Sequence, residues 1–373
     1  MPITLKNLNS IWNRYYQQCI AVFFTCLGLY FRYKALVGRS LWLDETNQFN
    51  NTVGPLKPFW QRLSYCELTS FPGEYLLCWP FVQIFGMNKW GINIPHILSA
   101  ILGFFLFYLV CKRYLKSKIG WIIAFSLLCF HRELIFHGFE FRPYAVLPTL
   151  SLACFYFSED IVDRIHVLSK IKQFFIGVLF VSIIVYHAYG AMIVFFCMLF
   201  FMSCALDKRE VMCMIKDLSP FLIMLALVAI PLFLWYATGN KGINILDAST
   251  NKHNYDVFRF IPNPVIDIIG FLKGVFCNLV GNKKFYFLFG ILPVACILPT
   301  KERDKQVRFF FLLVLIPILF KLTLDVSKGY WFLQRQFVWI MPLFCFYIGW
   351  CWDSVVLYFL EKFNEMRAIR NAE

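Results

Sequence analysis

The sequence predicts an all-α protein that crosses a membrane about ten times, within a range of about nine to twelve crossings. Hydrophobic residues make up 60% of the chain and charged residues only 16%, whereas an ordinary soluble domain has about 25% charged residues. The apolar residues are also grouped into stretches that approach the roughly 20 residues a spanning helix needs. We therefore expect residues 1–373 to form a single integral membrane domain.

The first apolar stretch indicates a helix that is retained in the protein. It is followed by Arg32, Tyr33 and Lys34 instead of the small residues of a signal-peptide cleavage site. The 14 cysteines lie mostly within apolar runs, where they act as small hydrophobic side chains. Their spacing predicts neither a disulfide framework nor a metal site, and no motif for a cofactor is visible.

Lysine and arginine in short loops predict the orientation, because cytoplasmic loops retain these residues. Dense basic clusters occur at 112–118, 164–172, 208–216 and 301–308. If these clusters and both termini lie inside, one path through the membrane follows. Its helices are 16–36, 92–111, 119–138, 143–158, 173–188, 190–206, 218–237, 285–300, 309–326 and 336–359.

That path leaves three segments on the outer side that are too long to be plain turns: 37–91, 239–284 and the shorter 327–335. Residues 75–87 are apolar but too few to span, and they predict a helix that lies on the membrane surface, as do residues 264–281. Many cations also fall on the outer side. They are either ordinary surface charge of long loops or a basic rim for a phosphate-bearing substrate.

The segment Arg39–Glu45, just beyond the first helix, contains two adjacent acids, Asp44 and Glu45, after the aromatic Trp42. A carboxylate at a bilayer surface can act as a general base toward a hydroxyl group. The alternative is that these acids form a solvated helix cap.

A second polar segment is expected at the outer turn between the third and fourth helices. It contains Glu140, Arg142, Pro143 and Tyr144. Proline is common in the first turn of a helix, and an arginine there can extend to the lipid headgroups. A purely structural role is therefore one interpretation of this turn.

Upstream of this turn, His131, Arg132, Glu133 and His137 occupy the outer half of the predicted third helix. Ionisable groups inside a membrane are costly and usually face a cavity or a partner. These residues predict an internal aqueous pocket near the outer surface.

These motifs together resemble those of the lipid-dependent GT-C glycosyltransferases. The shared features are a tryptophan followed by Asp-Glu at 42–45, a proline-tyrosine segment at 72–75 and a Glu-x-Arg-Pro-Tyr-Ala turn at 140–145. The order of helices is similar through most of the chain, and the branch it resembles is that of the protein O-mannosyltransferase-like and aminoarabinose transferase-like enzymes. The specific motifs lie within residues 39–147.

The resemblance implies transfer of a sugar from a polyprenyl-phosphate donor to a glycan, lipid or protein acceptor, with no nucleic acid as partner. It implies an active site on the extracytoplasmic side of a multi-pass protein in a lipid bilayer, which we expect to be a bacterial inner membrane with the site toward the periplasm or exterior. Asp44 then matches the catalytic base, with Glu45 beside it and Glu140 as a further catalytic acid. Arg142 and Arg335 match arginines that bind the donor phosphate.

Tyr75 and Tyr144 are further substrate-binding candidates on the same basis, and Arg132 and His137 are candidates because they belong to the predicted aqueous pocket. The acceptor side departs from the family pattern, because the His-Pro-Pro-Leu-Tyr-Tyr of relatives is reduced to Pro72 and Tyr75. Glu74 is a new acid in this segment, and the sequence predicts that it is a surface charge.

Two other classes of function remain open. A transporter or a lipid or glycan flippase would share the apolar helices, but should show repeated halves and interrupted helices in matching positions. The sequence shows neither. A polysaccharide polymerase is closer in chemistry, although two acidic motifs at consecutive outer loops favour a transferase.

Overall fold

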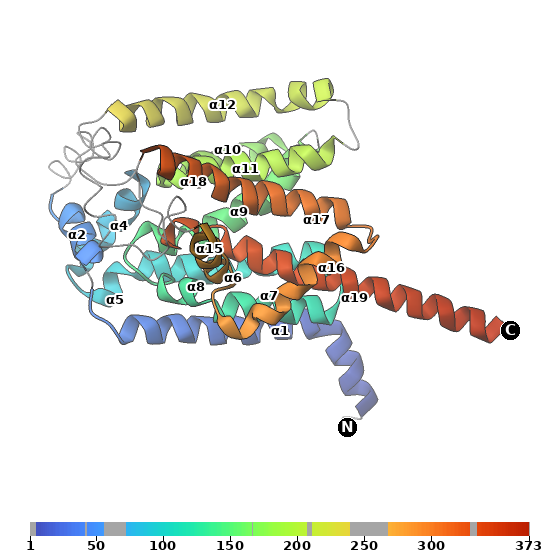
Figure 1. Cartoon of the computed structure of the whole chain (residues 1–373). Helices are drawn as coiled ribbons and strands as arrows, with labels where there is room; N and C mark the ends of the chain where they lie inside the picture. The colour runs from blue at the N-terminus through green and yellow to red at the C-terminus, as the bar shows by residue number, and fades with distance from the viewer. Residues whose placement is uncertain are drawn as a thin grey trace.

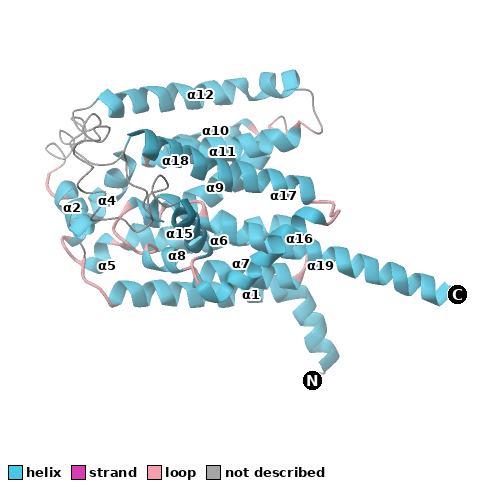
Figure 2. Cartoon of the chain, in the orientation of Figure 1, coloured by secondary structure: helices cyan, strands magenta, loops and turns pink. Residues whose placement is uncertain are grey.

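The computed structural model describes residues 5–41, 43–55, 72–165, 167–206, 211–238, 268–328 and 334–372. These residues form helices, turns and loops, with no strand among them (Figure 2). The predicted all-α class is therefore confirmed. The longest helices run roughly side by side and form a bundle (Figure 1).

Six helical stretches in the described part of the chain are long and apolar enough to cross a membrane. They lie in α1 (Leu5–Val37), α6 (Ile94–Tyr114), α11 (Ala188–Ala205), α12 (Val211–Thr238), the continuous run α17 (Arg303–Phe309), η3 (Phe310–Leu315) and α18 (Ile316–Lys328), and α19 (Met341–Ala372). Many of their large apolar side chains are exposed to the surroundings, as expected for a lipid-facing surface. The chain is therefore a multi-pass membrane protein.

A seventh candidate crossing is bent. Helix α15 (Ile268–Val280) meets η2 (Lys283–Gly290), which continues into α16 (Ile291–Ile297), and the axes differ by 96°. Gly281 lies at the corner with a φ of +69°, a conformation that favours glycine. A Cβ at Gly281 would also lie 2.6 Å from Nδ1 of His131. Glycine is required here for both reasons.

The third predicted crossing is interrupted. Residues 119–138 were expected to form one helix, but α7 (Lys118–Phe130) ends at His131 and the short α8 (Arg132–Phe136) follows. The ring of His131 accepts the N–H of Leu134 and so caps α8. This polar cap explains why the chain breaks inside an apolar run.

Two further predicted crossings are shorter or more charged than a simple spanning helix. Helix α10 (Lys170–Tyr186) has 17 residues. Helix α9 (Leu147–Arg164) ends in a charged turn with Glu159, Asp160 and Arg164. Six crossings, or seven with the bent pair, are thus supported by length and hydropathy among the described residues, fewer than the ten predicted.

Helix α19 packs along α7 in the middle of the bundle, where glycines allow close approach. A Cβ at Gly349 would lie 2.5 Å from the Cβ of Ala124. At the end of this contact the Asp353 carboxylate accepts the backbone N–H groups of Lys116 and Ser117. The carboxylate therefore ties α19 to the start of α7.

The two ends of the bundle differ. Both termini project from one end, whereas α2 (Leu43–Thr52), α4 (Pro72–Phe85) and α5 (Lys89–Ile92) gather at the other (Figure 1). The short helices predicted at 75–87 and 264–281 are present as α4 and α15, but α15 belongs to the bent candidate crossing, and a position on the membrane surface stays a prediction. The two candidate motifs can thus meet only at the end away from the termini.

This arrangement leads to a labelling prediction about the orientation. A cysteine placed at Asn51 should react with a membrane-impermeant reagent added to intact cells, whereas one placed at Lys305 should react only after the membrane is opened. The background would replace the exposed and half-buried native cysteines by serine and keep buried ones such as Cys78. The opposite labelling pattern would reverse the orientation and exclude an external active site.

Candidate functional site

The acidic pair of the first outer segment opens α2. Asp44 and Glu45 lie in the first turn of this helix, where the helix dipole favours negative charge. The two carboxylates nevertheless have different surroundings. The side chain of Asp44 is 27% exposed, whereas that of Glu45 is fully buried.

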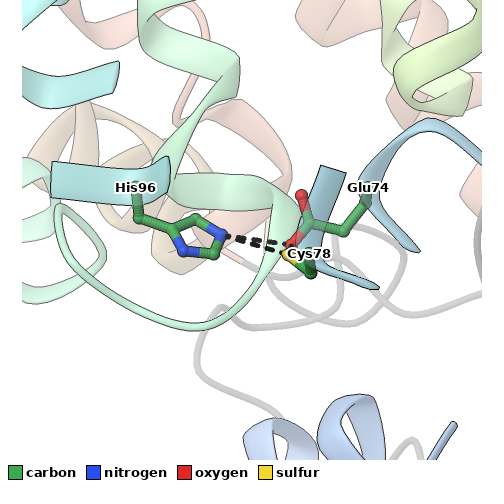
Figure 3. A group of neighbouring side chains, drawn as sticks. All are labelled: Glu74, Cys78 and His96. Atoms are coloured by element: carbon green, nitrogen blue, oxygen red, sulfur yellow. Dashed lines mark hydrogen bonds and ion pairs between the residues drawn. The ribbon is translucent and has the colours of Figure 1, made fainter. Parts of the chain in front are cut away.

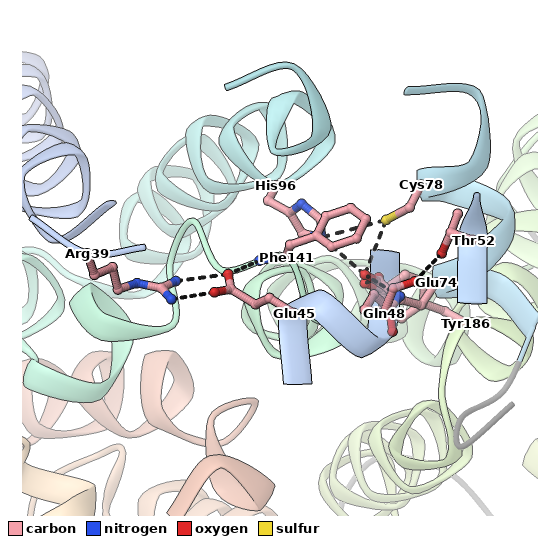
Figure 4. A network of polar contacts seen from close by, with 9 residues as sticks. All are labelled: Arg39, Glu45, Gln48, Thr52, Glu74, Cys78, His96, Phe141 and Tyr186. Atoms are coloured by element: carbon pink, nitrogen blue, oxygen red, sulfur yellow. Dashed lines mark hydrogen bonds and ion pairs between the residues drawn. The ribbon is translucent and has the colours of Figure 1, made fainter. Parts of the chain in front are cut away.

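Glu45 joins two segments that are distant in the sequence. Its carboxylate accepts two hydrogen bonds from the guanidinium of Arg39, at 2.5 and 3.0 Å, and a third from the backbone N–H of Phe141 at 2.8 Å (Figure 4). Paired arginine–carboxylate bonds of this kind are strong and directional. Glu45 therefore holds the 140–145 turn against the start of α2.

Arg142 lies on the same side of this junction as Asp44. Its Nη2 is 3.9 Å from Oδ2 of Asp44, beyond hydrogen-bond length, and the guanidinium lies 5.8 Å from the ring centre of Tyr144. Its Nε has no hydrogen-bond partner among the described residues. The guanidinium therefore retains donors for an incoming anion.

Arg142 stays positively charged although it is half-buried. Burial alone lowers the pKa of Arg142, but the neighbouring Tyr144, Asp44, Tyr75 and Glu140 more than offset it, so that the pKa lies above its ordinary value. Arg142 is thus a permanent cation with 14% of its side chain exposed.

Glu140 belongs to a second carboxylate–imidazole chain. Its fully buried carboxylate is hydrogen-bonded to Nδ1 of His137, whose Nε2 lies 3.7 Å from Glu133. The ring of His137 also lies 5.9 Å from that of Tyr144. His137 is therefore held between two acids beside the Arg142 turn.

The structure brings most of the predicted site residues to one place, and of those whose side chains are described only Arg132 lies apart. The residues that come together are Asp44, Glu45, Tyr75, His137, Glu140, Arg142 and Tyr144. Arg132 points away, with 83% of its side chain exposed and its Nε 3.9 Å from Glu133. The backbone of Arg335 lies in η4 (Gln334–Phe337), but its side chain is outside the described part, so its phosphate role stays a prediction.

The prediction for Glu74 was wrong, because this residue is fully buried. Its carboxylate accepts a hydrogen bond from the Tyr186 hydroxyl (Figure 4) and lies 3.1 Å from Nε2 of His96 and 3.3 Å from Sγ of Cys78 (Figure 3). Burial by itself raises the pKa of Glu74, but His96, Tyr186 and Cys78 together hold it below its ordinary value. Glu74 is therefore a buried carboxylate within a cluster of polar groups.

The sequence contained only a weak signal for this cluster. Glu74 and Cys78 are four residues apart and so share a helix face, but His96 and Tyr186 come from α6 and α10. Glu74, Cys78 and His96 are the described residues whose ligand atoms lie close enough to hold one metal ion.

A buried cation in α1 is the other feature that sequence reasoning missed. Arg32 is 5% exposed, donates to the carbonyl of Gly28 at 2.9 Å and lies 4.8 Å from the ring centre of Phe104. It lines a cavity that also touches Gly138 and Ala145. The buried Arg32 therefore lies against the 137–146 turn that carries Arg142.

No protein-family model, curated protein or solved structure matches this chain.

Proposed function

We propose that the protein is a glycosyltransferase that moves a sugar from a polyprenyl-phosphate carrier to an acceptor on the extracytoplasmic side of the membrane. The observation that supports this best is the pairing of a carboxylate and a guanidinium that are both half-buried. Asp44 and Arg142 come from the two motifs that resemble those of lipid-dependent glycosyltransferases, and they lie 3.9 Å apart. A base and a phosphate-binding group are the two functions that such a reaction needs.

The proposed reaction assigns one task to each group. The acceptor hydroxyl gives its proton to the Asp44 carboxylate while its oxygen forms a bond to the anomeric carbon of the sugar. The bond from that carbon to the phosphate oxygen breaks, and the electron pair leaves with the polyprenyl phosphate. Arg142 stabilises the negative charge that develops on this leaving group. Attack opposite the departing phosphate inverts the anomeric configuration.

The remaining predicted residues then take supporting parts. Both oxygens of Glu45 are occupied by Arg39, and one also accepts from Phe141, so we assign Glu45 to positioning the two motifs. The Glu140–His137 pair orients the turn that carries Arg142. Tyr75 and Tyr144 lie near enough to Arg142 to raise its pKa. In the proposed reaction they would contact the sugar or its phosphate.

The proposal keeps the path of ten crossings. Besides the six long stretches and the bent α15–α16 segment, α7 with α8, α9 and α10 would each cross the membrane within the bundle. A helix covered by protein on most sides can be shorter or carry charge, because lipid does not contact those positions. An even number of crossings is also consistent with two termini at the same end (Figure 1).

One observation favours a transporter as a second candidate. The interrupted α7–α8 helix and the bent α15–η2 pair meet where Nε2 of His131 lies 3.1 Å from the carbonyl oxygen of Leu279, and transporters often bind substrates at such breaks. The absence of internal repeats in the sequence is the argument against it.

A donor assay distinguishes the two candidates. The purified protein in nanodiscs should release polyprenyl phosphate from a polyprenyl-phosphate sugar when acceptor glycans or lipids from the host membrane are supplied, and mass spectrometry should find the glycosylated product. Nucleotide sugars should yield no product, because no phosphate-binding glycine-rich turn is visible in the sequence. Movement of the lipid-linked sugar across a vesicle membrane without any bond cleavage would instead support the transporter.

A further inference from the structure

A second cluster of polar side chains lies between α4 and α6 and borders α2 at Gln48, one helical turn beyond Asp44. Oε1 of Glu74 and Sγ of Cys78, both on α4, face Nε2 of His96 on α6 (Figure 3). All three side chains are fully buried. Carboxylate, thiolate and imidazole are the three groups from which protein zinc sites are built.

The spacing of these atoms matches one tetrahedral ion. The separations are 3.1 Å between Glu74 Oε1 and His96 Nε2, 3.3 Å between Glu74 Oε1 and Cys78 Sγ, and 4.0 Å between Cys78 Sγ and His96 Nε2. Zinc bonds of about 2.0–2.3 Å at tetrahedral angles place neighbouring ligand atoms about 3.3–3.6 Å apart. Small movements of these side chains would therefore place all three ligand atoms at bonding distance from one ion.

A fourth ligand is available from α2. The side chain of Gln48 is 1% exposed, its Nε2 lies 3.5 Å from Oε1 of Glu74, and its Oε1 has no hydrogen-bond partner among the described residues (Figure 4). Exchange of the two amide positions by rotation of the side chain turns this carbonyl oxygen toward the cluster. A buried amide oxygen without a partner is costly, and a cation would supply one.

The surroundings also fit an outer shell. The second carboxylate oxygen of Glu74 accepts the hydroxyl of Tyr186, which fixes the carboxylate as outer-shell hydrogen bonds fix metal ligands. Gly73 allows this contact, because a Cβ there would lie 2.3 Å from the Cα of Tyr186. The segment that departs most from the family pattern is thus the one that packs the cluster against α10.

We propose that Glu74, Cys78 and His96, with Gln48 as fourth ligand, bind one Zn²⁺ ion. The site has no open position for substrate, so the ion is structural. It joins α4 and α6 to α2, the helix that carries Asp44, and so fixes the base relative to the bundle. The proposed ligands are different side chains from Asp44 and Arg142, so the metal content can be measured independently of the proposed transferase activity.

Metal analysis of the full-length protein tests the proposal. Protein purified in detergent without chelators should contain about one zinc per chain by plasma mass spectrometry, and Cys78→Ser should reduce this content to background. Cys197→Ser is the matched control, because Cys197 is equally buried in α11 but lies outside the cluster. Zinc retained in Cys78→Ser at the level of the control would overturn the site.

A second measurement keeps the test decisive if Cys78→Ser does not fold. Protein stripped of zinc by a chelator and loaded with Co²⁺ should show the ultraviolet charge-transfer band of a cobalt–thiolate bond, and zinc should displace that band. Removal of the ion should also lower the Tm of the unmodified protein, because a ligand that binds only the folded state stabilises it. Absence of both the band and the Tm shift would show that the cluster is only a buried hydrogen-bond network.

Discussion

Replacement of Asp44 by asparagine should abolish sugar transfer while leaving the folded protein in the membrane. Asparagine has nearly the same shape as aspartate but cannot accept a proton from the acceptor hydroxyl. Loss of a general base typically lowers the rate by about 10²- to 10⁴-fold. Because the Asp44 side chain is 27% exposed and its distance to Arg142 is 3.9 Å, the change should cost little stability. Initial rates with saturating lipid-linked donor would measure the effect.

The control for this variant is Asp304→Asn. Asp304 lies in the first turn of α17, with 77% of its side chain exposed, and α17 and α2 lie at opposite ends of the bundle (Figure 1). Its replacement should leave the rate unchanged. A fully active Asp44→Asn protein would contradict the mechanism proposed for Asp44 and would leave Glu140 as the acid to test next.

The course of the long helices could be predicted from the sequence, whereas their interruptions could not. Runs of apolar residues are visible in one dimension and predict where helices lie. At the break the ring of His131 caps α8 and also contacts the carbonyl of Leu279, far along the chain. The corner at Gly281 depends on the same histidine ring. A hydropathy pattern contains no information about such pairs, and so it predicted one straight helix over 119–138.

The candidate site could likewise be predicted only in part. That Asp44, Glu45 and Arg142 would lie on one face could be expected from motif order, and the structure places them side by side. The different burial of the two acids could not be expected, because it arises from Arg39 and from the Phe141 backbone. The burial of Glu74 likewise comes from other helices, since its partners belong to α6 and α10.

Replacement of Arg142 by alanine should weaken use of the lipid donor and leave the protein folded. A charge-assisted hydrogen bond contributes about 1.5–3 kcal/mol, so that kcat/KM for the donor should fall about 10- to 150-fold. Arg142→Lys should recover only part of this loss, because an ammonium keeps the charge but lacks the planar pair of donors that matches a phosphate. Kinetics with varied donor concentration would separate the effect on KM from that on kcat.

The comparison with a distant arginine decides whether this loss is specific. Arg303, at the start of α17, has 43% of its side chain exposed and contacts Asp304, so Arg303→Ala should use the donor normally. If the Arg142 cation binds phosphate, raising the salt concentration should weaken donor use by the unmodified protein more than by Arg142→Ala, because screening acts on a charge pair that the variant lacks. Equal salt sensitivity of the two proteins, together with an unchanged kcat/KM in Arg142→Ala, would remove Arg142 from the donor site. In that case the buried Arg32 beside the same turn would be the next cation to replace.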